Sequence, residues 1–194
     1  LAELDERDLR GSLTKLEDSG LVFRRGEPPK ASYSFKNTLV QEAAYASLLK
    51  QRRQMLHARV AQLLSEESGA LSRTQPELLA HHYTEAGEVE AAVKHWLEAG
   101  RQAAQRSANQ EAIAHLDKGL AIVDGIVDEA LHRRLEITLN LALGTAIQAA
   151  HGYVAPADAA FQRALTLSDA ADRTHDLFEA MFGLWLFHHM RREF

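Results

Sequence analysis

The fold is decided by residues 75–122, which read QPELLAHHYTEAGEVEAAVKHWLEAGRQAAQRSANQEAIAHLDKGLAI. This stretch predicts three consecutive helices, with small residues where two helices touch and large residues where side chains are buried. Read as a 34-residue helix-turn-helix repeat that begins at Arg73, its second helix has small, large and small residues at the usual places, which are Ala92, Trp96 and Ala99. A frame that begins at Val93 gives the same pattern one helix later, at Ala112, Leu116 and Gly119. The middle helix therefore fits both frames, as expected when each helix packs on the one before and the one after.

The same spacing occurs a third time, at Ala157, Phe161 and Ala164. Three recurrences of one spacing indicate a tetratricopeptide-like α-solenoid, in which each repeat buries the apolar face of its neighbour. We expect its helices at residues 75–86, 88–105, 108–124, 128–151, 156–172 and 174–192. The fold class predicted for the chain is therefore mainly α.

Residues 1–36 have a different pattern. A helix predicted over residues 5–19 ends at Gly20, and two short strand-like runs then flank a turn that contains glycine and proline. A helix followed by a β-hairpin is typical of the C-terminal part of a winged-helix unit. We place connecting helices at residues 37–73, and truncated tetratricopeptide-like repeats at residues 74–194, with the boundary in the polar segment 68–74.

Composition excludes several classes of protein. The chain has 194 residues, no cysteine and a net charge of −5, so it has neither a disulfide framework nor a thiolate metal site. No run of 18 apolar residues is present, which argues against a membrane span and favours a cytoplasmic protein. Basic side chains are in excess over residues 1–60 and acidic ones over residues 61–194, which indicates two modules. Because the sequence begins with Leu1 and ends within an apolar helical pattern, we expect it to be a fragment of a longer protein.

Three runs carry a family resemblance: YSFKNTLVQEAAYASLLKQRRQMLHARVAQLL, PELLAHHYTEAG and AVKHWLEAGRQAAQRSANQEAIAHL. They resemble the region behind the ATPase module of bacterial STAND-class signalling NTPases, which are often fused to an adenylate or guanylate cyclase domain or to a transcriptional-regulator domain. The resemblance covers nearly the whole chain and is most specific from Tyr33 to Leu120. It implies the order cyclase or regulator domain, P-loop ATPase, winged helix and helical repeats, with the upstream ATPase domain as a partner of this chain.

The resemblance assigns a candidate nucleotide-sensor position to Asn37. Related proteins usually have a histidine there, in the phrase F-x-H-x-L, and that histidine resembles a sensor that contacts the phosphates of bound ADP. An asparagine amide can donate a hydrogen bond but carries no positive charge, so its hold on phosphate is weaker. The alternative, which the spacing supports better, is that Asn37 is the N-cap of the following helix.

No catalytic residue, cofactor site or metal ligand emerges from the sequence. The P-loop pattern G-x-x-x-x-G-K-[ST], the dinucleotide pattern G-x-G-x-x-G, the zinc pattern H-E-x-x-H and the cyclase signature are all absent from the 194 residues. The adjacent pairs His81–His82 and His188–His189 project about 100° apart on a helix and so do not chelate one ion together.

A nucleic-acid partner is disfavoured. The basic residues Lys50, Arg52 and Arg53 and a winged helix would suit DNA, but the helix before the wing, residues 5–19, carries more carboxylates than cations. We expect the basic residues to pack against an acidic neighbour instead.

The solenoid frames define a candidate groove for a protein or peptide partner. The positions that usually face the groove are Glu77, His81, Thr84 and Glu85 in the first frame, and Lys94, Leu97 and Arg101 in the second. A groove with this acidic character favours a basic or helical peptide. The alternative is that these residues are merely solvated.

The aromatic residues Tyr83, Trp96 and Phe161 are predicted to lie between helices, whereas the apolar run 182–187 is expected to be exposed and available for homodimer contacts. The resulting hypothesis is a non-catalytic regulatory and protein-interaction segment of a larger signal-transduction ATPase, fused in some members to a nucleotide cyclase. The alternatives are a winged-helix DNA-binding transcriptional regulator with a helical-repeat sensor, and an enzyme of unrecognised type.

Overall fold

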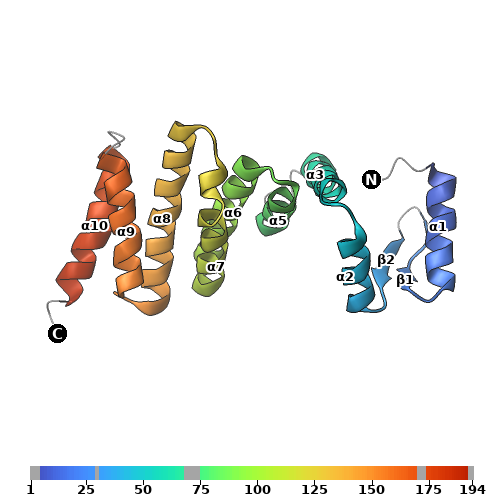
Figure 1. Ribbon diagram of the computed structural model, residues 1–194. Coiled ribbons are helices and arrows are strands. Elements are labelled where there is room, and N and C mark those ends of the chain that lie inside the picture. Colours follow the sequence, from blue (N-terminus) through green and yellow to red (C-terminus); the bar gives the residue numbers. More distant parts are fainter. Residues whose placement is uncertain (1–4, 29–30, 68–74, 170–173, 192–194) are drawn as a thin grey trace.

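A computed structural model describes residues 5–28, 31–67, 75–169 and 174–191. Within these residues the protein is mainly helical, with nine α-helices, one short 3-10 helix and one two-stranded sheet. Figure 1 shows the elements placed one after another, so that neighbours in sequence are neighbours in space. The mainly α fold class is confirmed.

The elements, in chain order, are α1 (Glu6–Asp18), β1 (Val22–Arg25), β2 (Ser32–Phe35), α2 (Thr38–Ser47), α3 (Lys50–Glu67), α5 (Pro76–Ala86), α6 (Val89–Gln105), α7 (Asn109–Leu120), η1 (Val123–Gly125), α8 (Glu129–His151), α9 (Ala155–Asp169) and α10 (Thr174–Arg191). The predicted helices and the hairpin are confirmed to within a few residues, except that the end of the helix predicted over residues 108–124 is a 3-10 turn. The predicted module boundary, residues 68–74, lies outside the described residues.

The N-terminal elements α1, β1, β2 and α2 contact mainly one another and make few contacts with the rest of the chain. The hairpin is antiparallel, with Val22 opposite Phe35, and Val22 is its buried residue. The Asn37 side chain accepts a hydrogen bond from the Leu39 amide at 2.8 Å, so the predicted N-cap of α2 is confirmed. No residue of α2 is buried, and Leu39 is 71% exposed.

From α3 onward each helix packs against the next. The pairs α3–α5, α5–α6, α6–α7, α7–α8, α8–α9 and α9–α10 are all in close contact. In addition, α6 contacts α8 and α8 contacts α10, so these three helices lie along one side of the array. Every helix from α6 to α9 therefore has neighbours on two sides and must bury two faces.

The recurring small and large residues lie at these helix contacts. All nine members of the three predicted sets are buried: Ala92, Trp96, Ala99, Ala112, Leu116, Gly119, Ala157, Phe161 and Ala164. A Cβ atom added at Gly100 would lie 2.6 Å from Cγ of Leu116, and one added at Gly144 would lie 2.8 Å from Cζ of Phe161. Glycine is therefore needed at these two further positions, because the large member of a set on the neighbouring helix occupies the space beside each of them.

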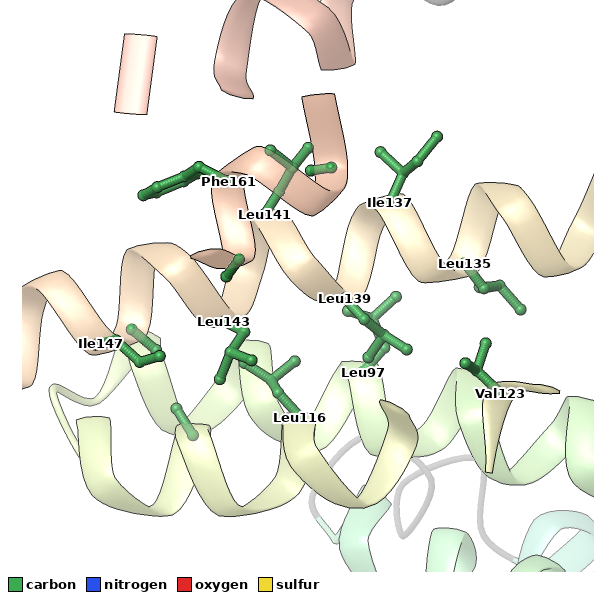
Figure 2. Packing of buried hydrophobic residues seen from close by; sticks show 14 of the residues in the cluster. Leu97, Leu116, Val123, Leu135, Ile137, Leu139, Leu141, Leu143, Ile147 and Phe161 are labelled. Carbon is green, nitrogen blue, oxygen red and sulfur yellow. The ribbon is translucent and has the colours of Figure 1, made fainter. Parts of the chain in front are cut away.

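Helix α8 is the centre of the main apolar core (Figure 2). Leu139 and Leu143 point toward Leu97 and Leu116 of the preceding helices, whereas Leu141 lies on the side of Phe161 from α9. Residues four apart lie on one helix face, so Leu139 and Leu143 form one apolar face of α8, and Ile137 and Leu141 form another. This pattern explains why α8, at 23 residues, has buried residues along most of its length.

The prediction for the aromatic residues is confirmed for Trp96 and Phe161, whereas Tyr83 is only partly buried and the run 182–187 is exposed only in part. Trp96 and Phe161 are buried, and the Trp96 indole Nε1 donates a hydrogen bond to Oγ1 of Thr84 at 3.0 Å. In the run 182–187, Leu184 is buried, but Phe182 and Trp185 are 52% and 57% exposed. None of the helices in the described ranges combines the length and apolarity that a membrane crossing requires.

Candidate functional site

Three of the predicted groove residues line one cavity between α5 and α7, which we call the α5–α7 cavity. Its volume is about 680 Å³. The predicted members are Glu77, His81 and Thr84, and the other residues that line it are Gln75, Leu78, Trp96, His115, Lys118, Ala121 and Ile122. The helix α6 supplies the floor through Trp96, because its indole ring fills the space between α5 and α7.

The indole ring of Trp96 organises this cavity. Its Nε1 is fixed by Thr84, the Lys118 Nζ lies 4.6 Å from the ring centroid, and His115 stacks at 5.5 Å. A cation over an indole face is stabilised by the ring quadrupole. Among the described residues no carboxylate pairs with Lys118, so its ammonium is available to an acidic group that enters the cavity.

The side chains of Glu77 and Lys118 give the α5–α7 cavity one carboxylate on the α5 wall and one ammonium on the α7 wall. Leu78 and Ile122 supply apolar surface beside them. This arrangement suits a peptide that carries charged side chains of both signs around an apolar one. The sequence interpretation missed His115 and Lys118, which are three residues apart and therefore lie on one face of α7. Ile122 follows the end of this helix and also lines the cavity.

Arg101 lies on another surface. It lines a groove of about 890 Å³ along α6, α8 and α10, together with residues that include Thr138, Gln148, Phe178 and Phe182. The predicted groove residues therefore do not form a single surface. A third cavity, also about 890 Å³, lies over α8 between α7 and α9, and burial raises the pKa of Asp117 in its wall.

The prediction that Leu97 faces the groove is wrong. It is 6% exposed and belongs to the main core, so it does not face a groove. The reason is that α6 also packs against α8, and this contact buries the face of α6 that the frame starting at Val93 treats as open. Lys94 is exposed and forms an ion pair with Glu90 one turn earlier on the same helix.

Glu85 points away from the α5–α7 cavity and takes part in a hydrogen-bonded cluster of Tyr45, His57, His82 and Glu85, which we call the junction network. Tyr45 lies on α2, His57 on α3, and His82 and Glu85 on α5. The Tyr45 hydroxyl donates to Oε2 of Glu85 at 3.2 Å and lies 3.1 Å from Nε2 of His57. Nδ1 of His57 lies 2.9 Å from Nδ1 of His82. The network therefore joins three helices.

The surroundings of the junction network favour neutral side chains. Burial, followed by the nearby charges of His81 and Arg53, lowers the pKa of His57, although Glu85 opposes this shift. Burial also lowers the pKa of His82, with smaller effects in the same direction from His57 and His81. Burial and the Glu85 carboxylate raise the pKa of the Tyr45 hydroxyl.

No group of three His, Cys, Asp or Glu side chains in the described ranges is arranged to hold a metal ion. His81 lies beside the junction network, with its ring centroid 5.8 Å from that of His57. The Asn37 side-chain oxygen is used by the Leu39 amide, so its role as a cap is established, whereas its role as a nucleotide sensor stays a prediction.

The chain is similar to an uncharacterized protein of Rhizobium meliloti (strain 1021), with 29% identity over 144 residues. The alignment covers 74% of this chain, and the chain spans only 14% of the length of that relative. No model of a protein family matches the sequence, and no solved structure matches it.

Proposed function

We propose that this chain is a non-catalytic regulatory segment of a larger signal-transduction ATPase, in which α5–α10 form a tetratricopeptide-like solenoid that binds a protein or peptide. The burial of all three small–large–small sets is the observation that carries this proposal, because a repeated contact between successive helices is what a helical-repeat array requires. The additional contacts of α8 with α6 and α10 support it, since alternate helices of a solenoid line one side.

The parent protein in this proposal contains a P-loop ATPase ahead of the chain and, in one form, a nucleotide cyclase. The similarity to a much longer protein is consistent with such a parent. The elements α1, β1, β2 and α2 are proposed to be the tail of a winged-helix unit that packs against the ATPase domain. Their exposed apolar side chains support this placement: Leu9, Leu21, Phe23, Phe35 and Leu39.

The α5–α7 cavity is the proposed peptide site. A random peptide library selected on the chain should yield sequences that carry a charged residue on each side of an apolar one. Because Glu77 and Lys118 lie on opposite walls, the charge reversals Glu77→Lys and Lys118→Glu should each weaken the selected peptides about tenfold or more, as expected for a charge pair worth at least 1.4 kcal/mol. Glu98→Lys, an exposed change on α6 outside the cavity, is the matched control. Unchanged binding by both cavity variants would contradict the site.

The parent assignment has its own test. The gene that encodes this chain should specify a P-loop module upstream of residue 1, and Asn37→His in the parent should strengthen ADP binding because it adds a group able to carry positive charge. The chain by itself should bind duplex DNA no more tightly at 50 mM than at 200 mM salt. Salt-sensitive duplex binding would instead support the transcriptional regulator.

A further inference from the structure

The junction network has only one consistent arrangement of protons. The Glu85 carboxylate can only accept, so the single Tyr45 hydroxyl proton points to Glu85. The Tyr45 oxygen must then accept from Nε2–H of His57. A neutral imidazole with its proton on Nε2 has an acceptor at Nδ1, so the proton between the two histidines belongs to Nδ1 of His82. Each group in the chain of hydrogen bonds thus has a defined role.

This arrangement tolerates one added proton and excludes the second. His82 can take a proton at Nε2 and still donate from Nδ1 to His57. Once His82 holds protons on both of its nitrogens, a further proton on Nδ1 of His57 would place two N–H groups face to face across 2.9 Å, and the hydrogen bond would be lost. Because both nitrogens of His57 belong to one rigid ring, a ring that turns away from His82 also leaves the Tyr45 hydroxyl.

The attachment of α2 depends on this network. The helix has no buried residue, and outside its contact with β2 it makes few contacts with other described elements. Tyr45 supplies hydrogen bonds to both α3 and α5, and Arg53 of α3 lies 5.1 Å from its ring centroid. We infer that the junction network is a pH-responsive contact, which holds the unit α1–β1–β2–α2 against α3 and α5 and releases it when His57 and His82 are both protonated.

The direction of the pH dependence follows from the linkage between proton binding and opening of the junction. The charged and titratable groups that face His57 are Arg53 on its own helix, Tyr45 on α2, and His81, His82 and Glu85 on α5. The closed junction excludes a proton that a free histidine, with a pKa of about 6.5, accepts. The contact is therefore stable above pH 6.5 and weakens as the pH falls below it, with the equilibrium constant for opening rising by up to about tenfold per pH unit.

The proton positions can be tested directly. Long-range ¹H–¹⁵N correlation spectra of the imidazoles at pH 7.5 should show the Nε2–H tautomer for His57 and the Nδ1–H tautomer for His82. The Nε2–H tautomer at His82 would overturn the inference, because no donor would then lie between the two rings.

The release can be tested by distance measurement. The chain has no cysteine, so Ser34→Cys on β2 and Ala114→Cys on α7 give one labelled pair at two exposed positions. Electron–electron double resonance in the presence of a chelator should give a narrow distance distribution at pH 7.5 and a broader one at pH 5.5. Tyr45→Phe should broaden the distribution already at pH 7.5, because it removes both hydrogen bonds of the hydroxyl and keeps the ring.

Two further variants distinguish release through the junction network from a general effect of acid on the chain. His57→Gln does not titrate, so its distance distribution should be the same at pH 7.5 and pH 5.5. His81→Gln is the matched control: His81 lies beside the network but forms none of its hydrogen bonds, so this variant should keep the response to acid. The inference would be overturned if the labelled chain without further substitutions gave the same distance distribution at pH 7.5 and pH 5.5. A full acid response in His57→Gln, with helicity retained, would also overturn it.

Discussion

The helices α6–α9 and the elements α1, β1, β2 and α2 both have well-formed secondary structure but differ strongly in packing. In α6–α9, buried side chains recur along each helix, whereas Val22 is the one buried residue among the described residues 5–49. The difference arises because each helix from α6 to α9 has neighbours on two sides, while α1 and α2 each contact mainly one strand of a two-stranded hairpin. Secondary structure can thus be complete where tertiary burial is slight, and most of the stability lies in α6–α9.

The largest expected contrast comes from removing one aromatic ring in each region. Phe161→Ala should lower the free energy of unfolding by about 3–5 kcal/mol, because the ring is 3% exposed and fills the space beside two glycines. Phe23→Ala should cost less than about 1 kcal/mol, since most of the ring is already in water. Urea unfolding followed by circular dichroism measures both. Equal losses would contradict the difference in packing.

Two glycine substitutions should change stability in opposite directions. A Cβ atom at residue 144 would meet the Phe161 ring at 2.8 Å, and the same ring is also in contact with Gly183. Gly144→Ala should therefore destabilise α8 by about 1–2 kcal/mol, even after the gain in helix propensity. At Gly11 of α1 an added Cβ meets nothing within 4 Å, so Gly11→Ala should raise helix stability by up to about 1 kcal/mol. Amide exchange of the two helices would show the opposite signs.

Two arginines make a further matched pair. Arg163 donates from Nε to Oε1 of Glu136 at 2.7 Å, and the Glu136 side chain is only 10% exposed. Arg163→Ala should lower the free energy of unfolding by about 1–2 kcal/mol, because it leaves a buried carboxylate with fewer partners. The loss is limited because Arg163 itself is half exposed. Arg24→Ala should cost about 0–0.5 kcal/mol, since the Arg24–Glu17 pair is 3.5 Å long and solvated. A larger loss at Arg24 would show that α1 and β1 are held by charge.

The smallest contrast involves two helix caps. Asp128 accepts a hydrogen bond from the Leu131 amide at 2.9 Å, and Asn37 accepts one from the Leu39 amide at 2.8 Å. Each substitution by alanine should remove about 1 kcal/mol from its helix. Asp128→Ala should lower global stability because α8 lies in the core, whereas Asn37→Ala should increase amide exchange in α2 alone. A global effect of Asn37→Ala would show that α2 is coupled to the array more tightly than its packing indicates.

The sequence was a good guide to elements and to core positions. The predicted helices, the hairpin, the Asn37 cap and the burial of Trp96 and Phe161 all follow from local periodicity and from recurrent small and large residues. These features depend on residues close together in the chain, whose relative positions a helix fixes. The recurrence itself identified the helix contacts, because a large side chain requires a small one opposite.

The candidate groove could be predicted only in part. Glu77, His81 and Thr84 meet in the α5–α7 cavity, but Glu85, on the same helix, turns toward α2 and joins the junction network. The repeat frame predicts an open face for Leu97, but this residue lies in the core because α6 also contacts α8. Which face of a helix stays open depends on the helices two places away, and a frame applied to one repeat does not contain that information.

By itself, therefore, the sequence determined a mainly helical chain with its turns, its caps and the residues buried between adjacent helices, since those depend on spacing within about one repeat. Only the tertiary structure decided that Lys118 lies over Trp96, and that Tyr45, His57 and His82 form one hydrogen-bonded network. These groups are separated by 12 or more residues, and their distances are set by how whole helices pack.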